Sequence, residues 1–257
     1  MLSKSTLKYI RSLRQAKSRQ KYHKIVVEGT KSVHELLQLG IVHIDGLYAL
    51  EPWIENNAPL LQKTGIEANV ITGQELSMIS AFTTPQHVIA VCEMPHSVLP
   101  AQDLPAQKLC LYLDGIRDPG NAGTIFRIAD WFGISHIYLS SDTVDPYNPK
   151  VIQASMGSLF RISWSETVLP DVIETPGIHA FLTMPDGENI FTATLPETGL
   201  IILGNESAGV RIPHAYTQAR RLSIPGDPGR GADSLNVAVS AGIICAEFYR
   251  QRSRANA

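Results

Sequence analysis

The sequence has 257 residues, of which 44% are hydrophobic and 18% charged, which suits one or two packed domains rather than a disordered chain. No apolar run approaches the ~20 residues of a membrane-spanning helix, and the first residues lack the apolar core of a signal peptide, so we expect no membrane association. The three cysteines are far apart, which argues against a disulfide framework and a metal site and favours the cytoplasm.

Charge is spread unevenly along the chain. The formal net charge is −2, but residues 1–24 hold eight basic and no acidic side chains, while the rest carries 14 basic against 24 acidic ones. A basic end on an acidic body indicates a polyanionic partner at the N-terminus. A solvated charged helix accounts for the same pattern, so charge alone leaves both interpretations open.

The first part of the chain alternates helix and strand patterns. Leu7, Ile10 and Leu13 have the spacing of one apolar helix edge. Thr30 is placed to cap a helix that ends at Gly40. Strands are predicted at 25–27, 46–50, 68–72 and 87–92, and further helices near 52–63 and 73–81. These elements predict a small α/β domain over residues 1–94.

A proline-rich stretch follows this domain. Pro95, Pro100 and Pro105 recur every five residues, and proline at that density continues neither a helix nor a central strand. We therefore predict a linker over residues 95–106 and a second domain over residues 107–257.

The second domain alternates strands and helices more strongly. Strands are predicted at 109–113, 137–139, 180–183, 200–203 and 221–224, and helices from Asn121, over 148–160 and from Ser234. The last helix carries one apolar stripe, formed by Val237, Ala241, Ile244, Cys245 and Phe248. This alternation predicts a mostly parallel sheet that is covered on both faces.

Three glycine-rich turns each follow a predicted strand, and open α/β sheets bind ligands at that edge. In the first, residues 114–127, Asn121 is predicted to cap a helix. Arg127 lies about 200° around that helix from Ile125, so it is expected to project away from the core, where it suits a phosphate. The second, residues 200–209, combines Gly204 and Gly209 with the single acid Glu206.

The third turn, residues 224–239, is rich in glycine before a helix that Ser234 is predicted to cap. Asn236 lies in the first turn of that helix, where its amide can orient a neighbour. Each of the three turns taken alone also fits an ordinary capped helix or tight turn. The chain has neither the G-x-G-x-x-G fingerprint nor the G-x-x-x-x-G-K-[ST] loop, which disfavours dinucleotide and nucleoside triphosphate chemistry.

Together the three turns resemble the motifs of the SpoU (TrmH-like) branch of the SPOUT methyltransferases. The first motif, N-x-G-x-x-x-R, is matched by Asn121, Gly123 and Arg127; the second, G-x-E-x-x-G, by Gly204, Glu206 and Gly209; the third, I-P…S-L-N-V, by Ile224, Pro225 and residues 234–237. Residues 5–13 and 27–29 resemble the ribosomal-protein-like RNA-binding domain that many members carry.

The resemblance implies a SPOUT domain with a C-terminal trefoil knot, a homodimer, and methyl transfer from S-adenosyl-L-methionine (SAM) to a ribose 2′-hydroxyl of structured RNA. By position, the SAM contacts are Leu203, Gly204, Ile224, Ser234 and Leu235. The implied catalytic residues are Arg127, Asn121, Glu206 and Asn236. The family assigns proton acceptance to Arg127, but a guanidinium stays protonated, so we expect it to grip the target phosphate and stabilise an alkoxide.

Several alternatives remain at this stage. Ribosomal RNA of the large subunit (23S) is favoured over tRNA, and a non-catalytic RNA-binding protein of the same fold is the main rival from another class. A base-modifying methyltransferase of the same superfamily and, more remotely, a dehydrogenase complete the set. The loop over residues 226–231 is longer than the common form of the third motif, which leaves the contacts around it open.

Overall fold

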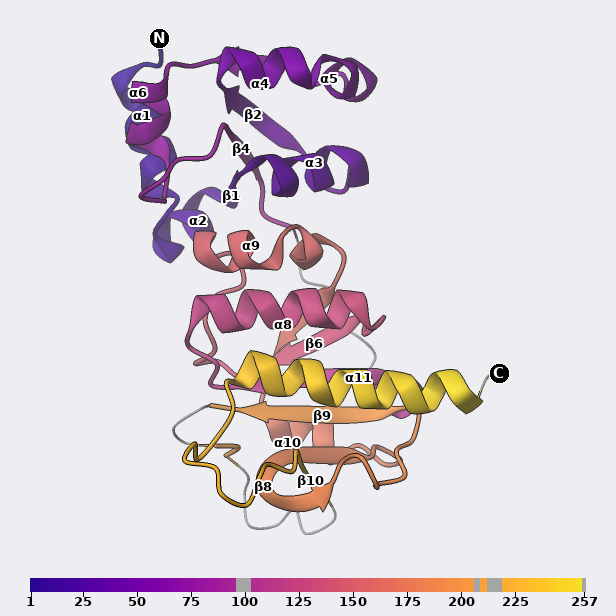
Figure 1. The fold of residues 1–257 in the computed structure, drawn as a ribbon. Coiled ribbons are helices and arrows are strands. Elements are labelled where there is room, and N and C mark those ends of the chain that lie inside the picture. Colours follow the sequence, from indigo (N-terminus) through magenta and orange to yellow (C-terminus); the bar gives the residue numbers. More distant parts are fainter. Residues whose placement is uncertain (96–102, 206–208, 212–218, 256–257) are drawn as a thin grey trace. The chain divides into compact units, whose positions relative to one another are not determined.

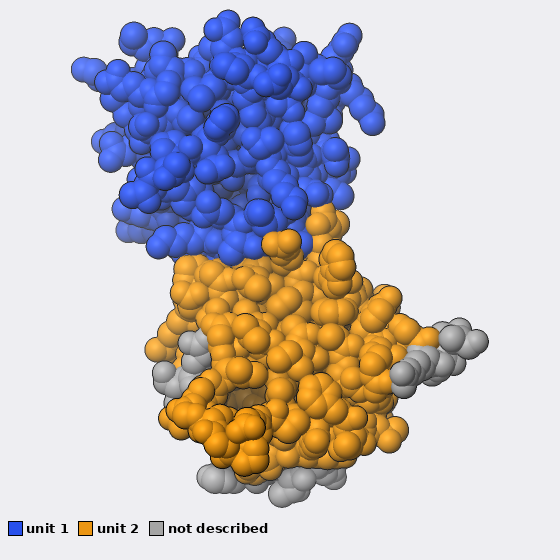
Figure 2. Space-filling model, viewed as in Figure 1, with its two compact units in different colours: residues 1–96, 145–160 blue, residues 97–144, 161–257 orange. Residues whose placement is uncertain are grey.

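The structure is a computed structural model that describes residues 1–95, 103–205, 209–211 and 219–255. It divides into two compact units, coloured separately in Figure 2. Unit 1 consists of Met1–His96 and Asp145–Phe160, and unit 2 of Ser97–Val144 and Arg161–Ala257.

Unit 1 is a small α/β unit built around a mixed four-stranded sheet in the order β1-β4-β2-β3. Strand β4 pairs antiparallel with β1 and β2, and β2 pairs parallel with β3. Helices α1 and α6 pack on this sheet through a core that includes Ile10, Leu13, Ile79 and Ile89. The elements are α1 (Lys4–Ser12), α2 (Ala16–Tyr22), β1 (Lys24–Glu28), α3 (Thr30–Leu39), β2 (Ile44–Ala49), α4 (Glu51–Asn56), α5 (Ala58–Thr64), β3 (Ala68–Val70), α6 (Gly73–Ile79), β4 (Val88–Glu93), α9 (Pro149–Ser155) and the 3-10 turn η1 (Ser158–Phe160).

The ends of α3 show one correct and one wrong expectation. Gly40 ends the helix in the left-handed conformation (φ 60°), as predicted. Thr30 is not the cap: Gly29 precedes the helix at φ 106°, where a side chain would be strained, and Thr30 is the first helical residue. The hydroxyl of Thr30 instead accepts a hydrogen bond from the indole of Trp53 at 2.9 Å.

Residues 145–160 pack as part of unit 1, although they follow a strand of unit 2. Asp145 accepts a 2.5 Å hydrogen bond from the buried Arg19. A Cβ at Gly157 would lie 2.5 Å from Cγ of Glu35, so the side chain of Glu35 leaves room only for a glycine there. The single helix expected over 148–160 is wrong, because Met156 at φ 53° ends α9. Unit 1 thus includes residues beyond the stretch 1–94. The limits given above for the two domains and the linker stay a prediction.

Unit 2 is built on a six-stranded sheet in the order β10-β8-β9-β5-β6-β7, and each of the described pairings in it is parallel. This confirms the mostly parallel α/β fold. Its elements are α7 (Leu104–Gln107), β5 (Leu109–Asp114), α8 (Pro119–Trp131), β6 (His136–Leu139), β7 (Ser163–Glu166), α10 (Leu169–Ile173), β8 (Ala180–Asn189), β9 (Gly199–Gly204), β10 (Arg220–Ser223) and α11 (Val237–Ala255).

Helices cover both faces of this sheet. On one face, α10 packs against the side chains of Cys110, Tyr112 and their neighbours, which form one core cluster. On the other face, Phe248 of α11 meets Phe181 of β8 edge to face, with ring centroids 5.2 Å apart. Figure 1 shows α8 and α11 side by side. The predicted apolar stripe of the last helix is buried, which confirms that α11 faces the core.

The order of the strands places a topological switch point between β5 and β9. From β5 the chain continues to β6 on one side, whereas from β9 it continues to β10 on the other. The two strands pair in register to their last residues, Asp114 and Gly204. Ligands of open α/β sheets bind outside the carboxyl ends of strands at such a point.

In the described part of the chain, no helix is long and apolar enough to cross a membrane.

Candidate active site

The first two glycine-rich turns lie against each other at the switch point. The side-chain amide of Asn205, just after β9, donates to the carbonyl of Gly115, just after β5, at 2.9 Å. Asn205 and Gly209 exchange both backbone hydrogen bonds, at 3.1 and 2.8 Å, and so close a tight turn. A Cβ at Gly204 would lie 2.3 Å from the carbonyl carbon of Gly209, so only glycine fits there. The turn therefore brings backbone groups of both strands to one edge.

The third turn returns from β10 to the start of α8. The amide of Asn236 donates to Oδ1 of Asn121 at 2.9 Å. Its own Oδ1 accepts from the backbone N–H groups of Ala238 and Val239, at 3.0 and 3.2 Å, so Asn236 caps α11. The expectation that the helix starts at Ser234 and is capped by it is therefore wrong. The side-chain amide of Asn236 therefore caps α11 at the end of the loop and also contacts Asn121 of the first motif.

The start of α8 also differs from the expectation. Asp118 is the N-cap, and its carboxylate accepts from the backbone N–H of Asn121 at 2.8 Å. Asn121 was the predicted cap, which is wrong; it lies inside the first turn, where its side chain meets Asn236 instead. Both residues are cap-forming types, and Asp118 takes the role because Pro119 follows it as the first helical residue.

Arg127 lies on the exposed side of α8, as its helical spacing predicted. Within the described residues its side chain makes no hydrogen bond and no ion pair. It is six residues beyond Asn121, which corresponds to about 9 Å along a helix. An exposed guanidinium without a protein partner keeps all of its donors available for an anion.

The residues assigned to cofactor contact differ in how far they are exposed. Leu203, at the end of β9, is fully buried. Ile224 is half-buried, and Ser234 is exposed. Leu235 keeps 47% of its surface exposed. Glu206 lies outside the described residues, between the two partners of the tight turn.

An ionic cluster at the same edge has no counterpart in the sequence-based expectations. The guanidinium of Arg211 lies between the carboxylates of Asp114 and Asp142, 2.5 and 2.7 Å away. Hydrogen bonds from Arg211 and Arg117 hold the pKa of Asp142 well below its usual range, and the two carboxylates raise the pKa of Arg211. The one sequence signal was an acid, Asp114, at the end of an otherwise apolar strand.

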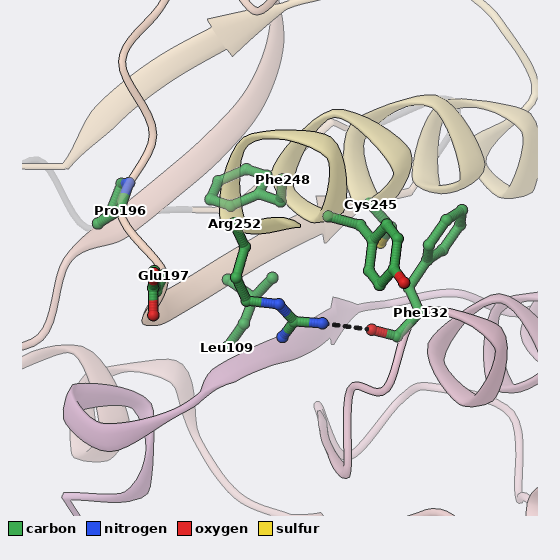
Figure 3. A pocket seen from close by; sticks show the side chains of 8 residues that line it. Leu109, Phe132, Pro196, Glu197, Cys245, Phe248 and Arg252 are labelled. Carbon is green, nitrogen blue, oxygen red and sulfur yellow. Dashed lines mark hydrogen bonds between the residues drawn. The ribbon is translucent and has the colours of Figure 1, made fainter. Parts of the chain in front are cut away.

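A pocket lies at the opposite end of β5 (Figure 3), bounded by Leu109, Phe132, Pro196, Glu197, Cys245, Phe248, Tyr249 and Arg252. Arg252 donates to the carbonyl of Phe132 at 3.1 Å across it. Burial raises the pKa of the Cys245 thiol to about 12, which keeps it protonated and unreactive. The pocket has no room for a water molecule. We therefore place the candidate site at the carboxyl ends of the strands and not in this pocket.

Comparison with known proteins identifies the family. Residues 108–246 match the SpoU rRNA Methylase family, and residues 4–90 match an MRM3-like substrate binding domain. The chain belongs to the SpoU rRNA methylase family, which confirms the resemblance drawn from its three motifs. In the described ranges, no group of three or more histidine, cysteine or acidic side chains is arranged to hold a metal ion.

Individual relatives match over nearly the whole chain. The 23S rRNA (guanosine(2553)-2'-O)-methyltransferase RlmP of Bacillus subtilis is 31% identical, over 91% of this chain and 92% of its own length. A putative TrmH-family RNA methyltransferase from Porphyromonas gingivalis is 34% identical, with a TM-score of 0.81 over 98% and 99% of the two chains. An AdoMet-bound rRNA methyltransferase from Sinorhizobium meliloti is 31% identical, with a TM-score of 0.82 over 97% and 96%.

Proposed function

We propose that this chain transfers a methyl group from SAM to a ribose 2′-hydroxyl of structured RNA, with 23S ribosomal RNA as the substrate. The observation that carries the proposal is the meeting of three motif loops at one switch point of a parallel sheet, through the Asn205–Gly115 and Asn236–Asn121 contacts. The names of the relatives support the same reaction: one is a 23S rRNA 2′-O-methyltransferase, and one structure carries bound AdoMet.

The loops at this edge fit such a methyl donor. Gly204 lets the chain double back so tightly that backbone groups of β9 and its turn stand at the rim of the site. The apolar surface of Ile224 and Leu235 suits a flat base, and the hydroxyl of Ser234 is open to solvent. We assign SAM binding to these residues and to the backbone of Leu203. SAM supplies an electrophilic methyl group when it is bound.

Arg127 is the residue that we assign to the RNA. Methyl transfer requires the ribose oxygen to be held in line with the methyl group and to lose its proton. The protonated guanidinium is suited to grip the neighbouring phosphate and to stabilise negative charge on the ribose oxygen. Its exposure and its lack of a partner among the described residues support this role.

Asn121 and Asn236 orient this arrangement. Their hydrogen bond ties the start of α8, the helix that carries Arg127, to the cap of α11. Because both termini are held by the same amide pair, the loop before α11 is fixed relative to α8. Glu206 completes the proposed catalytic set from its position between Asn205 and Gly209.

Unit 1 delivers the RNA in this proposal. Its first two helices expose Lys4, Lys8, Arg11, Lys17 and Lys21. None of these five forms an ion pair with the described part of the chain. Lysines and arginines without acidic partners neutralise phosphates and release counterions, so RNA affinity should fall steeply with salt.

We further propose a cytoplasmic homodimer with a trefoil knot at its C-terminal end. The knot is supported by the course of residues 224–236, which return from β10 at the sheet edge to α8 beside β5. The dimer is supported by the adjacent helices α8 and α11, which expose Trp131 (82%) and Val239 (51%). Light scattering on the Trp131→Glu variant tests it: we expect a dimer to become a monomer.

The experiment that tests the proposed function locates the methyl group. Purified protein and labelled SAM are incubated with protein-free 23S rRNA and, in a parallel reaction, with tRNA, and each RNA is digested to nucleosides for mass spectrometry. We expect label on one ribose 2′-oxygen, with tRNA unlabelled. Label on a base would instead identify a base methyltransferase. Binding of RNA without methyl transfer, with no heat of SAM binding, would identify a non-catalytic RNA-binding protein.

A further inference from the structure

Asp114 is a buried carboxylate at the centre of the proposed site. It is the last residue of β5, its side chain is 6% exposed, and it lies in register with Gly204. Burying a carboxylate is costly unless a charged partner and hydrogen bonds satisfy it. Arg211 supplies both: its backbone N–H donates at 2.6 Å, its Nε at 2.9 Å and its Nη2 at 2.5 Å.

The same guanidinium reaches a third strand end. Its two terminal nitrogens donate to the two oxygens of Asp142, in the loop after β6, at 3.0 and 2.7 Å. Ser140 connects that loop to the loop after β5, because its hydroxyl donates to Asp142 at 2.9 Å and accepts from the N–H of Gly115 at 2.8 Å. Arg211 thus links the loops that follow β5, β6 and β9.

This link fixes the far end of the loop that carries the second motif. The near end is held by Asn205, which donates to Gly115. The far end is held by Arg211, which binds Asp114, the residue next to Gly115. Both ends of the stretch 205–211 are therefore tied to the end of β5. Backbone groups that are already held in place, as those of Asn205, Gly209 and Arg211 are, lose less conformational entropy when they bind a ligand, which increases affinity.

We infer that Arg211 is a positioning residue for the cofactor: by joining Asp114 and Asp142, it fixes the backbone of residues 209–211 beside the end of β9, where we propose that SAM binds. The inference rests on the proposed function. It makes Arg211, which lies outside the three motifs, a determinant of SAM affinity. Arg211 does not need to touch the cofactor for this role.

The planar fork of arginine is required for it. Nε and Nη2 serve Asp114, while Nη1 and Nη2 serve Asp142. Lysine has the charge but a single ammonium group, which cannot bind both carboxylates in the same way. Arg211→Lys should therefore keep part of the positioning effect on SAM affinity, and Arg211→Gln should lose that effect.

The experiment compares SAM binding and catalysis in Arg211→Gln and Arg211→Lys. Calorimetry gives Kd for SAM, steady-state assays give KM for SAM and kcat, and thermal melting reports folding. We expect Arg211→Gln to raise Kd and KM about tenfold or more, with kcat at saturating SAM changed less than about threefold, and Arg211→Lys to lie between. A purely structural role would lower Tm and the active fraction without moving KM.

Two variants keep the test decisive. Arg221→Gln removes an exposed ion pair between Arg221 of β10 and Asp186 of β8 and should leave Kd for SAM unchanged. Asp142→Asn keeps the Asp114 pair and should raise Kd a few-fold, which decides the matter if Arg211→Gln does not fold. Wild-type affinity in folded Arg211→Gln, or in Asp142→Asn if that variant is the one available, overturns the inference. Failure of the wild-type protein to bind SAM overturns the proposed function along with it.

Discussion

The two ends of strand β5 differ in kind. At its first residue, Leu109, a pocket is bounded mostly by apolar and aromatic side chains, with Glu197 and Arg252 as the charged ones, and the thiol of Cys245 is buried and inert. At its last residue, Asp114, charged and amide side chains tie together the loops of three strands. The pocket lies at one end of the strand and the groups that we propose for catalysis at the other, so the proposed site follows from strand order and not from the shape of the surface. We expect substitutions at the carboxyl end to change chemistry and those at the amino end to change stability.

The largest effect is expected for Arg127→Ala. Loss of the guanidinium removes the stabilisation of charge on the ribose oxygen, so kcat should fall about 10²- to 10³-fold, the range for loss of one charge-stabilising donor. Kd for SAM should stay at the wild-type value. Labelled-methyl assays and calorimetry measure the two quantities. Arg161→Ala, which removes an ion pair with Asp130, about one turn beyond Arg127 on α8, is the matched control; equal activity in both variants would contradict the assignment.

The next effect concerns His136, at the amino end of β6. Burial lowers its pKa to about 4, against 6.5 in an unfolded chain. Between these values the unfolded state binds the proton and the folded state does not, so the free energy of unfolding falls as the pH drops from 6.5 towards 4, by roughly 1 kcal/mol per pH unit. Above pH 6.5 the ring is neutral in both the folded and the unfolded state, so the free energy of unfolding no longer changes with pH through this histidine.

Thermal melts of His136→Gln at pH 7.5 and 5 measure this slope. We expect the variant, whose side chain does not titrate, to lose much of the decline in Tm seen in the wild-type protein, while kcat at pH 7.5 stays unchanged. His87→Gln, at an exposed histidine, should keep the wild-type decline. An unchanged slope in His136→Gln would show that other groups cause it.

A smaller effect separates the two roles of Asn236. Asn236→Asp keeps the oxygen that caps α11 but replaces the donor to Asn121 with a second acceptor. Its Tm should stay near the wild-type value while kcat falls about tenfold, as expected for loss of one oriented hydrogen bond. Asn236→Ala should lower kcat similarly and also cost about 1 kcal/mol of stability through the lost cap. Full activity in both variants would contradict the positioning role of Asn236.

The smallest effect is expected for Phe248→Leu at the amino end. Replacing the ring removes the edge-to-face contact with Phe181 but keeps most of the buried volume, so the free energy of unfolding should fall by about 1 kcal/mol. Denaturant unfolding measures this loss, and activity per folded molecule should not change. A change in kcat would show that this end of the sheet communicates with the catalytic edge.

Local patterns in the sequence predicted the long, apolar elements of the fold but not its short or polar ones. The runs that became β5 and β9 are continuous and apolar, so their burial was evident. Strand β7 is four residues of mixed polarity, Ser163–Glu166, and carries no such signal. Helix starts were misplaced by two or three residues because the sequence offers two capping residues at each: Asp118 and Asn121, then Ser234 and Asn236.

The candidate site was predictable only as far as its parts are local. The exposure of Arg127 followed from helical spacing. The hydrogen bond between Asn121 and Asn236 joins residues 115 positions apart, so only the family motifs suggested that they belong together. The cluster of Asp114, Asp142 and Arg211 also spans distant segments, and no motif includes it. Such contacts depend on strand order, which periodicity does not reveal.

The placement of residues 145–160 in unit 1 has a consequence for biosynthesis. When the first 96 residues leave the ribosome, Arg19 still lacks its carboxylate partner, Asp145. Gly157, which packs against Glu35, has not yet been synthesised either. The nascent chain must grow past β6 before unit 1 can be completed. For the same reason, an expression fragment that stops at the proline-rich stretch omits a helix of the unit it is meant to isolate.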